Sequence, residues 1–192
     1  MTRTRYLQIG AAIVAVALTA WGASRVLERM VSPVPQQSTA AAAGSAVASV
    51  PHIIATLYYA GSDGQSLAAI KREVPLADGV LAQGRQIIQS QLEAAPMPYV
   101  SVIPAGTTLR AFYVTDRGDA FVDLSPEIST AHPGGSTTEL LTVYALVNAV
   151  TTNLSSVQRV QILVGGKEAD TLAGHVDLRR PFERDTSLVK TP

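Results

Sequence analysis

A long uncharged segment near the N-terminus, Tyr6–Ala23, most constrains how this chain can fold. Its polar side chains are Gln8 and Thr19, and a helix of roughly 18 such residues can cross the hydrocarbon core of a bilayer. The sequence therefore predicts a transmembrane helix or signal anchor over 6–23. Only the residues that follow it are left to form a globular core.

The charges around this segment predict its orientation. Arg3 and Arg5 precede it, whereas the arginines that follow it are partly offset by Glu28. The more positive flank favours the cytoplasm, so we expect 1–5 to be cytoplasmic and the rest to lie outside the cytoplasmic membrane. A cleaved signal peptide that ends near Ala20–Gly22 is the alternative, and it would export the same residues.

A spacer and one domain are expected after the anchor. Residues 24–51 are rich in Ala, Ser and Pro, and such a stretch has too little apolar surface to offset the entropy of ordering it. We interpret it as a flexible linker. The sequence then predicts one domain over 52–185 and a C-terminal tail over 186–192.

Composition excludes several kinds of function. The 15 basic and 15 acidic residues give a formal net charge of zero, so the chain lacks the basic field that nucleic-acid binding needs. Cysteine is absent, which excludes disulfides, thiolate metal sites and lipidation of a cysteine. We expect no nucleic-acid partner.

Alternating and helical patterns in 52–185 predict a mixture of strands and helices. We expect a strand at 52–60, an extended piece at 66–76, a helix at 78–95, a hairpin at 108–125, a helix after Ser136 and a strand pair that turns at Gly165–Gly166. The predicted fold class is α/β (α+β), with two helices packed on one mixed β-sheet.

The sequence HPGGSTTE, His132–Glu139, could be a phosphate-binding loop or the start of a helix. No lysine follows Gly134 and Gly135, as it does in a phosphate-binding loop. Ser136 with Glu139 three residues later is instead typical of a capping box, in which each side chain accepts a backbone N–H. We therefore predict a structural helix cap.

The helix that follows carries no charged residue between Glu139 and Arg159. Its outer face is thus unlike the usual solvated helix face. One interpretation is a plain Ala/Thr surface or burial against the domain's own loops, and the other is a docking face for another protein. The residues of that predicted face are Thr138, Thr142, Ala145, Ala149 and Thr152.

Few residues suggest catalysis. The three histidines match no local metal motif, and we predict no catalytic, cofactor-binding or metal-binding residue. A hydrolase that uses His175 oriented by Asp177 remains the less favoured alternative. A small ligand or a cell-wall glycan could bind at loops beside Pro133 and at the Gly165–Gly166 turn.

Three stretches carry a family resemblance: ELLTVYALVNAV, VQRVQILVGGK and TLAGHVDLRRPF, within 132–182. They resemble the GerMN domain of spore germination and sporulation proteins. The resemblance implies an extracytoplasmic α/β module, similar to the ring-building motifs of envelope assemblies, with no established catalytic residues.

Together these patterns predict a non-catalytic, single-pass membrane protein of the bacterial cell envelope. Its partners would be other envelope proteins or further copies of itself. Ligand or glycan binding is the alternative function.

Overall fold

Residues 51–190 are described by a computed structural model, and all of them fall within one unit of the chain, Ala48–Pro192. The predicted cytoplasmic end 1–5, the predicted anchor 6–23 and almost all of the predicted linker 24–51 lie outside these described residues. Among the helices of 51–190, none combines the length and apolar character needed to cross a membrane.

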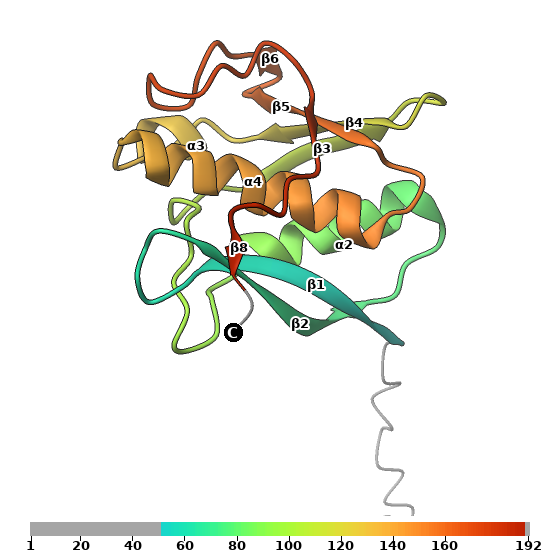
Figure 1. The fold of residues 1–192 in the computed structure, drawn as a ribbon. Helices are drawn as coiled ribbons and strands as arrows, with labels where there is room; N and C mark the ends of the chain where they lie inside the picture. Colours follow the sequence, from blue (N-terminus) through green and yellow to red (C-terminus); the bar gives the residue numbers. More distant parts are fainter. Residues whose placement is uncertain (1–50, 191–192) are drawn as a thin grey trace, which may run out of the picture. The chain divides into compact units, whose positions relative to one another are not determined.

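One sheet has three strands, at the bottom of Figure 1. β1 (His52–Ala60) pairs with β2 (Leu67–Pro75) as an antiparallel hairpin along its whole length. β8 (Val189–Lys190) adds to β2 in parallel. Alternate residues of β1, such as Leu57 and Tyr59, are fully buried, as expected of a strand with one face on a core.

A second sheet, at the top of Figure 1, has mixed strand directions. The hairpin β3 (Leu109–Val114) and β4 (Asp119–Leu124) is antiparallel, and β5 (Arg159–Val164) runs parallel to β4. Two short strands, β6 (Lys167–Glu168) and β7 (Phe182–Glu183), pair antiparallel with β5.

Two helices form a layer between the sheets (Figure 1). α2 (Gly79–Leu92) and α4 (Ser136–Asn153) contact each other, and each contacts strands of both sheets. The prediction of helices on one sheet is therefore wrong in part: the fold is α+β, but there are two sheets. A short helix that the sequence patterns missed, α3 (Glu127–Thr130), follows β4.

The middle position of α4 explains why it has no charged residue after its first turn. Leu146 and Val150 are fully buried, and so are Ala145 and Ala149, which the sequence assigned to the outer face. A helix that is covered on several sides must be apolar nearly all round. Burial within the domain, one of the two interpretations of this face, is thus what the structure shows.

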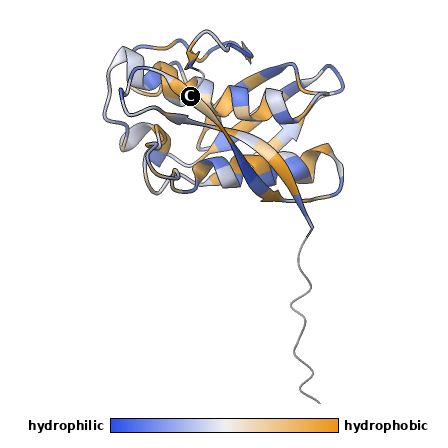
Figure 2. Ribbon diagram, turned by 60° about the horizontal axis from the view of Figure 1, so that its bottom comes forward, coloured by the Kyte–Doolittle hydropathy of each residue, from blue (hydrophilic) through white to orange (hydrophobic). Residues whose placement is uncertain are grey.

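Close packing also joins α2 to the second sheet. Gly84 of α2 faces the fully buried ring of Phe112 on β3, and a Cβ atom at position 84 would lie 2.2 Å from that ring. Glycine is the residue that permits so close an approach. Figure 2 shows apolar residues along the helices and on the strands that pack against them.

The C-terminal segment belongs to the fold. It passes α4, where the fully buried side chain of Asn148 donates to the Asp185 carbonyl at 2.6 Å and accepts the Asp185 N–H at 3.1 Å. It then reaches β2 as β8 (Figure 1). The described part of the predicted tail, 186–190, therefore includes a strand of the first sheet, Val189–Lys190.

Candidate functional site

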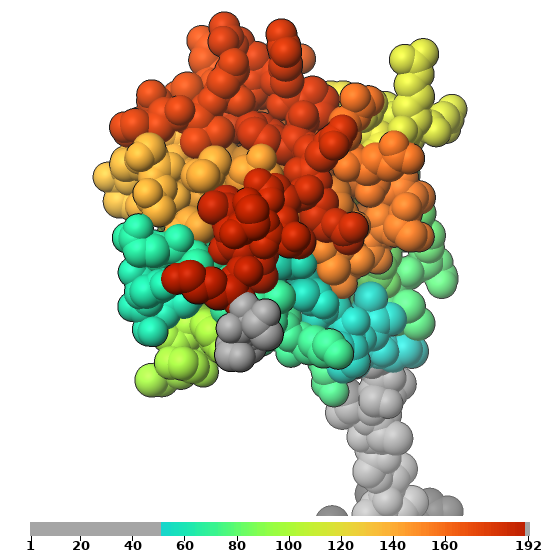
Figure 3. All heavy atoms as spheres, viewed as in Figure 1, coloured from blue at the N-terminus to red at the C-terminus, as the bar shows by residue number. Residues whose placement is uncertain are grey.

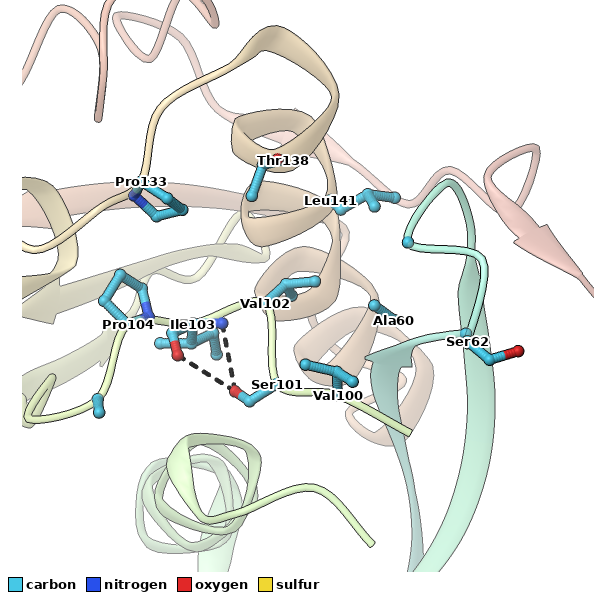
Figure 4. Close-up of a pocket in the computed structure, with 13 residues that line it drawn as sticks. Ala60, Ser62, Val100, Ser101, Val102, Ile103, Pro104, Pro133, Thr138 and Leu141 are labelled. Atoms are coloured by element: carbon cyan, nitrogen blue, oxygen red, sulfur yellow. Dashed lines mark hydrogen bonds between the residues drawn. The ribbon is translucent and has the colours of Figure 1, made fainter. Parts of the chain in front are cut away.

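A pocket of about 570 Å³ opens between the first turns of α4 and the two loops beside it (Figure 4). One wall is the connection Val100–Ala105 between α2 and β3, and the other is the end of β1 with its turn. Pro133 and Thr138 contribute from the start of α4. The remaining lining residues are Ala60, Gly61, Ser62, Gly64 and Leu141.

The wall at Val100–Ala105 is fixed by hydrogen bonds at three points. Val100 and Ala60 exchange backbone hydrogen bonds of 2.9 and 3.1 Å. The Ser101 hydroxyl lies 3.2 Å from both the N–H and the carbonyl of Ile103, as the dashed lines in Figure 4 show. The Thr142 hydroxyl of α4 is 2.7 Å from the Val102 carbonyl. The pocket is therefore preformed.

His132 supports this wall from behind. Its Nδ1 accepts the Gly134 N–H at 3.0 Å, so the ring proton of the neutral form must be on Nε2, which lies 3.1 Å from the Thr142 hydroxyl. Burial lowers the pKa of His132, and the nearby charge of Glu139 opposes that shift. The neutral ring thus completes a chain of hydrogen bonds from Gly134 to Thr142 and Val102.

An ion pair holds the opposite wall of the pocket. Asp63, in the turn after β1, accepts the Gln65 N–H at 3.0 Å and the Lys190 ammonium at 2.9 Å. These contacts, with that of Lys190 the largest, lower the pKa of the Asp63 carboxyl to about 2. The C-terminal strand therefore helps to hold the turn on which Ser62 and Gly64 line the pocket.

The lining of the pocket is suited to binding and not to bond cleavage. None of its described residues carries a charge or titrates near neutral pH, and its floor is made of buried apolar side chains such as Leu141 and Ile103. Val100 on the rim is 58% exposed. An apolar, uncharged group fits this lining.

A second hollow, of about 560 Å³, has the opposite character. It lies between the end of α4 and β7, and most of its surface is polar. Hydroxyl, amide, carboxylate and guanidinium groups all face it. The residues that line it are Thr151, Thr152, Ser155, Val157, Gln158, Glu183 and Arg184.

Glu139 does not cap α4, and the predicted capping box with Ser136 is wrong. The helix N-cap is Gly135, and no side chain bonds the helix start. The fully buried Glu139 carboxylate instead accepts backbone N–H groups from the loop before β7, those of Leu172 (2.8 Å), Ala173 (3.0 Å) and His175 (2.9 Å).

These contacts keep Glu139 ionised. Burial alone would raise the pKa of its carboxyl, but the backbone N–H donors outweigh burial, and the pKa lies below its usual value. A carboxylate with no solvent contact needs such donors. Tertiary contacts to a distant loop therefore replaced the local cap that the spacing predicts.

The structure does not pair His175 with Asp177, as the hydrolase alternative requires. Asp177 is held by Arg179 at 2.7 and 2.8 Å, which lowers the pKa of its carboxyl. The Nδ1 atom of His175 faces Glu139 at 3.3 Å. Neither His175 nor Asp177 lines either of the two hollows.

The predicted docking face of α4 is not an outer surface. Thr142, Ala145 and Ala149 are fully buried inside the domain. Thr152 is half-buried, and its hydroxyl lies 2.9 Å from that of Tyr58. Thr138 reaches solvent and lines the apolar pocket. The prediction is wrong because the face is covered by the first sheet and the Val100–Ala105 connection.

Of the two loops predicted to bind a ligand, one lines the apolar pocket. Pro133 lies on its rim, whereas Gly165–Gly166 is elsewhere, where the Gly166 N–H donates to Asp123 at 2.7 Å. No pattern in the sequence predicted that Val100–Ala105 would form a pocket wall. The signal that could have found it was a connection with β-branched apolar residues between prolines, where polar residues are usual.

Among residues 51–190, no three His, Asp or Glu side chains gather as metal ligands would.

The sequence pattern of the Germane family, described as sporulation and spore germination, matches residues 56–170. This chain belongs to the Germane family. The match spans both helices and most of both sheets, and it includes the apolar pocket with both of its walls. No curated protein matches the chain.

Solved structures share the fold of this Germane domain. A Clostridium perfringens protein described as a lipoprotein is 24% identical, with a TM-score of 0.51 over 71% of this chain and 91% of that chain. The tandem GerMN domains of the sporulation protein GerM from Bacillus subtilis are 19% identical, with a TM-score of 0.55 over 70% of this chain and 46% of that one. The first GerMN domain of GerM is also 19% identical, with a TM-score of 0.51 over 69% and 96%.

Proposed function

We propose that this Germane domain is a non-catalytic interaction module of the bacterial cell envelope, which binds an apolar part of another envelope protein in the pocket beside Pro133. The segment 6–23 would anchor it in the cytoplasmic membrane, with the domain on the outer side. The observation that carries the proposal is the preformed pocket, whose lining has no charge and a floor of Leu141 and Ile103.

The surroundings of the pocket support binding over catalysis. Within residues 51–190 no hydrogen bond joins a pocket hydroxyl to a histidine, and His132, which does not line the pocket, is already bonded to Gly134 and Thr142. A nucleophile needs a base within hydrogen-bonding reach. The hydroxyl of Ser101 is already hydrogen-bonded to the backbone of Ile103.

A pair of matched variants tests the proposal. Val100→Asp places a carboxylate on the rim of the pocket, and Leu81→Asp changes a side chain of similar exposure, 49%, that does not line it. A photo-crosslinking residue at Ala105 would report which proteins approach the rim in cells that contain the full chain. We expect Val100→Asp to abolish the major crosslinked product and Leu81→Asp to retain it.

The outcome that contradicts the proposal is equally clear. If Val100→Asp gives the same crosslinked products as the parent chain, the pocket is not the docking site. Melting curves of both variants should match the parent, since both side chains are largely exposed. If only one variant has a lower melting temperature, the two are not comparable, and Ser62→Glu, at another exposed residue that lines the pocket, would then replace Val100→Asp.

A cell-wall glycan is the second candidate ligand, and the polar hollow beside β7 is the observation that favours it. Its hydroxyl and amide groups suit a sugar, and Arg184 suits a carboxylate on it. Soluble glycan–peptide fragments should raise the melting temperature of the parent chain, because a ligand that binds only the folded state stabilises it. An equal rise in Arg184→Ala would exclude this hollow.

A further inference from the structure

The outer strands of the two sheets differ in whether their outward-facing backbone groups have hydrogen-bond partners. On β1, three successive outward-facing backbone positions are each satisfied by a partner outside the sheet. Both the N–H and the carbonyl of each position are used, at distances between 2.6 and 3.1 Å. The pairs are Thr56 with the Asn153 amide, Tyr58 with the Gln91 amide and Ala60 with the Val100 backbone.

Within the described part of the chain, 51–190, no such partners cover β3, the outer strand of the second sheet. Thr115 donates to Asp119 across the hairpin at 2.9 Å, so alternation places the backbone groups of Phe112 and Val114 on the side away from β4. No hydrogen bond from another described element of 51–190 reaches those groups. An unpaired strand edge is a template for a further strand.

The β3 sequence is complementary to itself. If two copies pair antiparallel with Phe112 opposite Val114 of the second copy, Tyr113 lies directly opposite Tyr113 of that copy. Tyr113 is 56% exposed and points away from the core. In such a position the two Cβ atoms are about 5 Å apart, and aromatic pairs there are favourable.

Charge favours the same register. The pairing that joins the two Tyr113 residues also brings Arg110 near Asp116 of the second copy, twice over because of the two-fold symmetry. Arg110 uses only its Nε–H for Asp123 of its own chain, at 3.2 Å, which leaves the rest of its guanidinium group for another carboxylate. Asp116 is exposed in the hairpin turn.

We propose that the β3 edge binds a second copy of this chain through antiparallel β3–β3 pairing centred on Tyr113. The end of the β3–β4 hairpin projects from the body of the domain at the upper right of Figure 3, and Tyr113 on β3 is exposed. Six residues make a small interface, so the pair is weak in dilute solution. Anchoring both copies in one membrane raises their effective concentration.

The absence of cysteine makes this proposal simple to test. Tyr113→Cys puts one thiol at the proposed two-fold axis, where two thiols come within bonding reach. Lys71→Cys puts one thiol on an exposed strand position of the first sheet as the control for random collision. Full-length chains in membranes, under mild oxidation, should give several-fold more disulfide-linked dimer with Tyr113→Cys.

Two further changes in the Tyr113→Cys chain test the edge itself. Val114→Pro removes an N–H that points away from β4, so the hairpin is retained while a new strand loses a donor. Asp116→Arg reverses the charge opposite Arg110. Both should reduce the dimer towards the Lys71→Cys level. If Val114→Pro lowers the melting temperature, the amount of dimer formed with Asp116→Arg is the result that tests the proposal.

The proposal is overturned if Tyr113→Cys gives no more dimer than Lys71→Cys, or if neither added change reduces the dimer. A disulfide-linked product of a mass other than twice this chain would mean that the edge binds a different protein, which also overturns it. None of these residues lines the apolar pocket, so the result leaves the proposed function to its own test.

Discussion

β1 and β3 are each the outer strand of a sheet, but different elements surround them. β1 lies beside the last turns of α2 and α4, so Gln91 and Asn153 can reach its backbone and imitate a neighbouring strand. β3 packs on α2 through Phe112 and Gly84, and within residues 51–190 no hydrogen bond from a helix reaches its outer edge. The position of the helices thus decides which strand edge has its backbone N–H and carbonyl groups bonded. Backbone groups that these helices do not reach can pair with a further strand.

The largest expected effect is on the closed edge. Gln91→Leu would leave the N–H and carbonyl of the buried Tyr58 without partners. Two such buried groups should reduce the free energy of unfolding by about 4 kcal/mol. Urea unfolding of the full chain in detergent measures the loss. Gln89→Leu, an exposed change on the same helix, should cost less than about 0.5 kcal/mol, and equal costs would contradict the assigned role of Gln91.

Next in size is the contact by which α2 holds β3. Gly84→Ala would place a Cβ atom 2.2 Å from the Phe112 ring, and overpacking should cost about 2 kcal/mol. The added change Phe112→Leu removes ring atoms at the clash. The double variant should therefore lose less than the sum of the two single changes, whereas simple additivity would place the clash elsewhere.

Asn153 closes the same edge as Gln91 but lies nearer to solvent. Asn153→Ala removes its contacts with the N–H and carbonyl of Thr56, at 2.9 and 2.8 Å. Because water can replace these partners, the loss should be about 1 kcal/mol. Hydrogen exchange at Thr56 and Tyr58 measures each closure separately. Faster exchange at Tyr58 than at Thr56 in this variant would contradict the division between the two amides.

The smallest expected effect is a pH dependence of stability. It should arise at His132, which supports the pocket wall, and not at the amides that cover the β1 edge. Amides do not titrate, whereas the pKa of His132 in the fold lies below its ordinary value of 6.5 because the ring is buried. The unfolded chain then binds the proton more readily, so stability falls as pH drops below 6.5 towards the lower pKa of the fold. His132→Asn keeps an acceptor for the Gly134 N–H and cannot titrate.

Melting temperatures of the parent chain and His132→Asn between about pH 7 and pH 5 test this sign. The parent should lose more stability on acidification than the variant. Parallel curves would mean that another group causes the loss. The carboxyl of Glu139, whose pKa is also lowered, contributes only at more acid pH, where the unfolded carboxyl takes up a proton below its ordinary value of 4.5.

Local patterns predicted the elements that depend on neighbouring residues. The strand at 52–60 and the hairpin of β3 and β4 agree with the alternation of their side chains, and α2 agrees with its helical period. Gly165–Gly166 turns the chain as expected. In each case the period and the turn residues lie within a few positions of one another, so no distant partner is needed.

Distant partners decided the rest. Glu139 has the spacing of a capping residue, but three N–H groups of the 172–175 loop outcompeted the helix start. The uncharged face of α4 is consistent with a docking face or with burial, and only the position of the first sheet distinguishes them. The apolar pocket joins three segments that are far apart in sequence, 60–64, 100–105 and 133–141, which no local pattern reports.

The sequence alone determined where this protein has its longer strands and its two long helices, and which family its pattern matches, because periodicity and turn chemistry act over short distances. Only the tertiary structure decided that the helices lie between two sheets, that Gln91 and Asn153 close one strand edge and that Val100–Ala105 completes a pocket. Those outcomes depend on which buried polar groups meet, and burial is a property of the packed chain.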